Sequence, residues 1–64
     1  MSYITHDESI KHDGGTHNLE VEIDGDQAVI RFGLSFTLRV SREEVWKLRD
    51  ILHDTGRELD QWSV

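Results

Sequence analysis

Residues 28–44 read AVIRFGLSFTLRVSREE, and this stretch decides the fold. Its first part alternates, with apolar residues at every even position: Ala28, Ile30, Phe32, Leu34, Phe36, Leu38 and Val40. Alternation is typical of half-buried strands, because successive strand side chains point to opposite faces of a sheet. The stretch ends in Ser41-Arg42-Glu43-Glu44, a capping box that is typical of a helix start. The sequence therefore predicts an α+β domain in which antiparallel strands lead directly into a helix.

A first strand is expected at about residues 19–24, where Leu19, Val21 and Ile23 alternate with acidic residues. A two-residue loop at Gly25-Asp26 suits a primed turn, because glycine tolerates a positive φ. This loop predicts a hairpin in which Ile23 faces Ala28 and Leu19 faces Phe32. A slip of one residue would turn every apolar side chain to the wrong face, so the matching pattern supports this register.

Gly33 leaves two interpretations of residues 28–40 open. A three-residue loop, Gly33-Leu34-Ser35, would give strands at about 27–32 and 36–40 and pair Phe32 with Phe36. The alternative is one long strand, bent at Gly33. We favour the loop, hence a three-stranded β-meander, because it keeps all the apolar residues except Leu34 on one face.

The helix is expected at about residues 42–55, with Ser41 as its N-cap. Its apolar positions fall on one stripe: Val45, Leu48, Ile51, Leu52 and Thr55. Gly56 is a natural residue to follow a helix end, which leaves 56–64 as a tail. If the helix continued past Gly56, Leu59 and Trp62 would fall on the same stripe. We expect this amphipathic helix to pack on one face of the sheet.

The domain organisation is predicted to be a single small domain at 19–64 behind a polar arm at 1–18. The arm is acidic, contains histidines, and is expected to be mobile and to add at most one short edge strand. The 64-residue chain has no cysteine and no long apolar run, so neither disulfides nor a membrane span is expected. No secretion signal is apparent either, and cytoplasmic residence is the expectation.

The net charge of −6 is carried by residues 1–26, which hold seven acidic residues and one basic residue, Lys11. Phosphate backbones repel such a chain, so nucleic-acid binding is not expected. An acidic mimic of nucleic acid, acting through residues 7–26, stays open as an alternative function.

No catalytic residues, cofactor or resident metal are predicted. The candidate metal ligands are His6, His12 and His17, but their spacing matches no zinc motif and the nearby Gly14-Gly15 favours a solvated arm. Ser41 is explained as a helix cap, and so small a chain has little room for a substrate pocket. We therefore do not expect an enzyme.

Trp46 is the large apolar residue that neither the strands nor the helix stripe claims. At about 100° per residue it lies away from the stripe. Tryptophan and arginine are enriched at interface hot spots, so the predicted protein interface is centred on Trp46. Its other members are Arg42, Arg49, Asp50 and His53. The alternative is that Trp46 lies on its own helix, shielded by the Arg42 and Arg49 side chains in cation–π contacts.

Size favours self-association as well. A three-stranded sheet has two open edges, and one helix covers a single face, so pairing of two copies would complete the fold. We therefore expect a homo-oligomer, most simply a dimer.

A pattern-level resemblance covers about residues 19–55. It rests on Val29-Ile30-Arg31-Phe32-Gly33, Phe36-Thr37-Leu38 and Ser41-Arg42-Glu43-Glu44-Val45 with Leu48 and Leu52. This pattern resembles small accessory proteins of actinobacterial bacteriophages. The resemblance implies a protein that binds and alters a host protein in the host cytoplasm, and it supplies no active site. The expected function is thus a small, self-associating protein-interaction module. A purely structural homo-oligomeric subunit is a further alternative.

Overall fold

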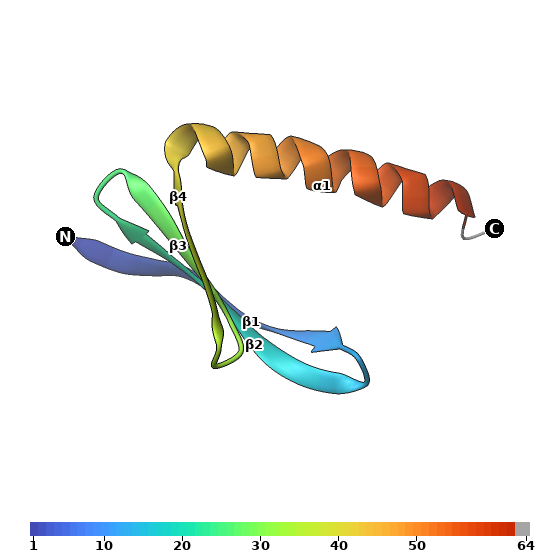
Figure 1. Ribbon diagram of the computed structural model, residues 1–64, viewed down its shortest axis with the longest axis horizontal. Coiled ribbons are helices and arrows are strands. Elements are labelled where there is room, and N and C mark those ends of the chain that lie inside the picture. The colour runs from blue at the N-terminus through green and yellow to red at the C-terminus, as the bar shows by residue number, and fades with distance from the viewer. Residues whose placement is uncertain (63–64) are drawn as a thin grey trace.

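The computed structural model describes residues 1–62, which form one four-stranded antiparallel sheet followed by one helix (Figure 1). The elements are β1 (Ser2–His12), β2 (Gly15–Asp24), β3 (Gln27–Phe32), β4 (Phe36–Ser41) and α1 (Arg42–Trp62). The strands lie side by side in chain order, β1-β2-β3-β4. The predicted α+β class is confirmed, with four strands instead of three. Residues 63–64, which end the expected tail, lie outside the described residues.

The predicted meander register is confirmed over β2, β3 and β4. Leu19 pairs with Phe32 and Ile23 with Ala28, as the Gly25-Asp26 turn requires. Phe32 pairs with Phe36, so Gly33 opens a three-residue loop and does not bend one long strand. Gly33 has a φ of 65°, and its amide donates to the Asn18 carbonyl at 2.9 Å. Only glycine adopts this conformation without strain, which explains why the loop begins there.

Residues 1–18, expected as a mobile arm, instead form β1 and the start of β2. The two strands are joined by Asp13 and Gly14, whose φ angles of 48° and 76° are both positive, as a type I′ turn requires. The pairing runs from His12↔Gly15 to Ser2↔Asp24. It shifts at Thr5, where an extra residue makes a bulge. The arm prediction is wrong because that bulge changes which face the alternate residues occupy, and so hides the strand pattern.

The helix is longer than predicted and runs through Gly56 to Trp62. Its start is confirmed, because the Glu44 amide donates to the Ser41 hydroxyl at 3.4 Å. Glycine costs only about 1 kcal/mol inside a helix, and the residues after Gly56 are mostly good helix formers. The prediction of an end near Thr55 is therefore wrong, and Leu59 and Trp62 continue the apolar stripe. Within the described residues, no helix has the length and apolar character needed to cross a membrane.

The predicted packing of the helix on one face of the sheet also needs correction. α1 approaches β3 and β4 but neither β1 nor β2, and none of its described residues is buried. In Figure 1 the helix leaves the end of β4 and runs out above the β1–β2 hairpin, well apart from it. Ser41 is the last residue of β4 and Arg42 the first of α1, so no linking residue lets the helix fold back onto the sheet.

Candidate functional site

One face of the sheet is apolar, and most of its side chains are only half-buried. The register places eleven apolar side chains on it, and we call this set the apolar face: Tyr3, Ile10, Leu19, Val21, Ile23, Ala28, Ile30, Phe32, Phe36, Leu38 and Val40. Only Ala28 among them is buried, with 6% of its surface exposed. Phe36, at 54%, is more than half exposed. A face of this composition normally forms the core of a small domain, and here it does not.

The opposite, polar face holds the most buried side chain, Val29, which is 2% exposed. Val29 lies between Glu22 of β2 and Arg39 of β4 in the sheet register. Arg39 reaches from β4 to Asp24 on β2, with 3.0 Å between Nη1 and Oδ2. Arg31 on β3 bridges to two carboxylates of β2. The long arginine side chains thus close over Val29, because their methylene groups cover apolar surface while their charged ends stay in water.

The two bridges of Arg31 have an electrostatic consequence. Its guanidinium donates to Glu20 at 2.9 Å and to Glu22 at 2.7 Å. The hydrogen bond from Arg31 is the main reason that the pKa of Glu22 lies below its ordinary value, and a hydrogen bond from Ser2 adds to it. The same bond to Glu22 raises the pKa of Arg31. Three of the acidic residues between positions 7 and 26 are therefore paired with two arginines, which leaves one net negative charge on this cluster.

A second apolar surface runs along α1, and we call it the helix stripe. Its members are the predicted positions and their continuation: Val45, Leu48, Ile51, Leu52, Thr55, Leu59 and Trp62. Val45 and Leu48, near the sheet, are half-buried. Further along, Leu52 is 66% exposed and Trp62 is 84% exposed. The helix stripe is thus covered at its start and open along the rest of its length.

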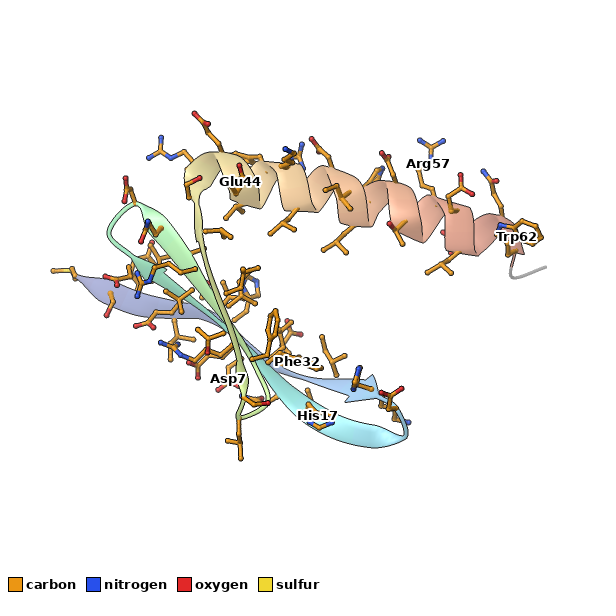
Figure 2. The ribbon with its side chains drawn as sticks, viewed as in Figure 1. Asp7, His17, Phe32, Glu44, Arg57 and Trp62 are labelled. Atoms are coloured by element: carbon orange, nitrogen blue, oxygen red, sulfur yellow. The ribbon has the colours of Figure 1, made fainter. Side chains whose placement is uncertain are left out.

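The helix stripe and the apolar face are on the same side of the junction between β4 and α1. In Figure 2, Arg57 points away from the sheet while Phe32 lies on the sheet below the helix. On an α-helix, Arg57 is about 140° from Leu52, so the stripe faces the sheet. Because α1 approaches only β3 and β4, the two surfaces diverge. We call the space between them the open angle.

A groove of about 330 Å³ lies at the closed end of the open angle. Its walls include Tyr3, Ile23 and Ala28 from the sheet and Val45 and Trp46 from α1. Trp46 is 54% exposed, and the Arg49 guanidinium carbon lies 4.7 Å from the centre of its ring system. This contact is the Arg49 part of the cation–π arrangement in the alternative interpretation, whereas Arg42 lines the groove. Trp46 therefore has one side on Arg49 and also borders the groove.

The five predicted interface residues separate into two groups. Arg42 and Trp46 line the groove. Arg49 and Asp50 form an ion pair at 2.9 Å on the helix, and His53 is exposed one turn beyond Arg49. Sequence reasoning missed Tyr3, which lines the groove from β1, because residues 1–18 were expected to be an arm. The Asp13-Gly14 pair was the signal that could have revealed β1, since Asp-Gly is a strong hairpin turn sequence.

The three candidate metal ligands do not converge. His12 and His17 lie edge to face with ring centres 5.7 Å apart, and both rings pack against Phe32. His6 is six residues from His12 along the same extended strand, and its Nδ1 is 3.0 Å from the Thr5 hydroxyl oxygen. No group of three or more suitable side chains that could hold a metal ion occurs within residues 1–62. His12 and His17 extend the apolar face as aromatic rings.

Comparisons with known proteins identify no match: no family model, curated protein or solved structure is similar to this chain. The apolar face, the helix stripe and the groove at Trp46 are therefore the features on which a function can be argued. Their chemistry suits the burial of another apolar surface, since most of the open side chains are aliphatic and aromatic. Glu8 and His6, which pair with Leu19 and Val21, are polar residues of β1 on the same face.

Proposed function

We propose that this protein is a non-enzymatic protein-interaction module that offers its open angle to another polypeptide. The partner would lie against the helix stripe and the apolar face, with Trp46 and the groove at the closed end of the contact. Large exposed apolar patches with polar surroundings mark interaction sites in soluble proteins. This is the role that the arrangement of the chain supports best.

The observation that carries the proposal is the incomplete burial of the apolar face. Val29 on the polar face is 2% exposed, while Phe36 on the apolar face is 54% exposed. A domain complete by itself buries its apolar face first, because that burial supplies most of the stabilisation. The incomplete burial of the apolar face is explained if a partner packs against it.

The acidic-mimic alternative is supported less well. Glu20, Glu22 and Asp24 lie in ion pairs with Arg31 and Arg39, so most of their charge is compensated and less of it is presented to a basic groove. A mimic also has no use for an exposed apolar face. The phage resemblance bears only on the identity of a further partner, for which it implies a host protein.

The test is photo-crosslinking in cells from three successive helix positions. Leu52, His53 and Asp54 are all exposed and point about 100° apart, so each samples a different side of α1. A photoreactive residue at position 52 reports on the helix stripe, one at 53 on the Trp46 side, and one at 54 on the outer side as the matched control. We expect protein adducts chiefly from position 52. Adducts from 53 alone would move the interface to Trp46, Arg49, Asp50 and His53, and no adducts above the position 54 level would contradict the proposal.

A further inference from the structure

The surface area of the chain indicates how much surface a partner could bury. A compact protein of 7.5 kDa exposes about 4,250 Å² by the general scaling of area with mass. This chain exposes 5615 Å². The excess of roughly 1,350 Å² exceeds the ~800 Å² that each partner buries in a standard protein interface. The excess surface of the chain is therefore large enough for a contact with a folded protein.

The chain's own helix cannot bury this surface. Ser41 pairs with Gln27 as the last residue of β4, and its hydroxyl caps the helix through the Glu44 amide. Strand-to-helix connections that return a helix onto its sheet commonly use about 2–6 loop residues, and this junction has none. Closing the angle would require the last pair of β4 and the helix cap to break.

Strand addition at the free edge of β1 is also disfavoured. The bulge at Thr5 interrupts the edge, and the charged residues Asp7, Glu8 and Lys11 follow it. Bulges and charges are the devices that natural sheets use against pairing at an edge. The free edge of β1 is therefore a poor place for a partner strand.

We propose that the occupant of the open angle is a second copy of this chain, with the helix stripe of each copy laid on the apolar face of the other. This inference rests on the proposed function and names its partner. The chain carries both surfaces of the proposed contact: a helix stripe that no sheet covers along most of its length, and an apolar face that its own helix covers only in part. A two-fold pair covers both at once, whereas an unrelated partner would have to supply a complement for each.

The dimensions of the two surfaces agree. The 21 residues of α1 span about 31 Å at 1.5 Å per residue. The ten residues of β2 span about 33 Å at 3.3 Å per residue. A helix from the second copy can therefore lie along the β1–β2 hairpin beyond the groove at Tyr3 and Ile23, where the chain's own helix leaves the hairpin uncovered.

The experiment uses the full chain and a spin label on the outer side of the helix. The sequence has no cysteine, so Gln61→Cys provides one labelling site, about 160° around the helix from Leu59. The spin-labelled variant, at natural isotope abundance, is mixed with ¹⁵N-labelled wild type. Sedimentation of the mixture gives the mass of the assembly. We expect twice 7.5 kDa and line broadening of sheet amides, centred on β1 and β2. A monomer at tens of micromolar, or broadening confined to α1 amides as in a helix-to-helix dimer, would overturn the inference.

The outcome separates this inference from the proposed function. A monomeric wild type whose position 52 still crosslinks to a different protein in cells contradicts the exchange of helices and leaves the interaction module standing. If the wild type is monomeric and position 52 gives no adduct, both this inference and the proposed function are contradicted. The spin-label measurement needs no substitution in the apolar face or the helix stripe, so it does not depend on a variant that fails to fold.

Discussion

Ala28 and Val29 are consecutive residues of β3, point to opposite faces of the sheet, and are the two buried apolar residues of the described chain. Ala28 borders the groove with Val45 and Trp46, so the start of α1 helps to cover it. Val29 lies under the arginine bridges of the polar face. The helix thus helps to bury Ala28, whereas the side chains of the ion pairs help to bury Val29.

Val29→Ala is expected to destabilise the sheet. The substitution removes two methyl groups from a buried site, which costs about 1.5 kcal/mol at ~0.8 kcal/mol per methylene-sized group. Urea unfolding followed by circular dichroism measures the change. Leu34→Ala is the control, because Leu34 is fully exposed in the β3–β4 loop and its loss should leave the midpoint in place. Equal effects of the two substitutions would contradict the special burial of Val29.

Substitution of two glycines by alanine should have opposite effects. Gly56 lies in the interior of α1, where an added Cβ meets no atom within 4 Å, so Gly56→Ala should stabilise the helix by about 1 kcal/mol. Gly14 also has open space, but its φ of 76° strains any other residue, and Gly14→Ala should destabilise the hairpin by a similar amount. Hydrogen exchange measures both effects, in the last two turns of α1 and in β1. Destabilisation by Gly56→Ala would mean that the helix does not pass through residue 56.

Loss of the helix cap is expected to affect the first turn of α1. Ser41→Ala removes the acceptor of the Glu44 amide and should cost about 1 kcal/mol. Hydrogen exchange at the Glu44 amide should accelerate in step with the loss of stability. Ser35→Ala, in the exposed β3–β4 loop, is the matched control and should change neither measurement.

The pair of Arg31 and Glu22 should make part of the stability depend on pH. The pKa of Glu22 is lowered in the folded protein by the hydrogen bond from Arg31, so folding favours the ionised carboxylate. This contribution is fully present above the ordinary glutamate pKa of about 4.3 and is lost as the pH falls through the lowered folded-state pKa. In Arg31→Gln, the Glu22 titration followed by carboxyl carbon NMR should move up toward its ordinary value. Arg42→Gln, which leaves the pair intact, should not move it.

The sequence was sufficient to predict the β2–β3–β4 meander because each of its turns has one register that keeps the apolar residues together. A slip at Gly25-Asp26 or at Gly33 would have turned Phe32 or Ile30 to the polar face. The helix start was equally determined, since Ser41 caps Glu44 by local contacts alone. These features depend on residues close in sequence.

The features that sequence reasoning missed depend on nonlocal relationships. β1 was hidden because the bulge at Thr5 breaks its alternation, and its pairing with β2 is visible only once the Asp13-Gly14 turn is built. The burial of Val29 requires Arg39 to cross β3 to Asp24, which no pattern along one strand reveals. The divergence of α1 from the sheet follows from a junction without loop residues, whereas amphipathicity alone suggested packing against the chain's own strands.

Salt should strengthen self-association of this protein. Two copies, each with a formal charge of −6, repel each other, while the proposed contact between helix stripe and apolar face carries few charges. The Debye length falls from about 30 Å at 0.01 M salt to about 10 Å at 0.1 M, so added salt removes the repulsion and leaves the apolar contact. The dimer Kd from sedimentation is expected to fall severalfold between about 20 and about 300 mM sodium chloride. An acidic mimic that binds a basic groove would show the opposite sign, because salt weakens attraction between unlike charges. A dimer Kd that rises with salt would therefore count against an apolar interface and in favour of charge pairing between the copies.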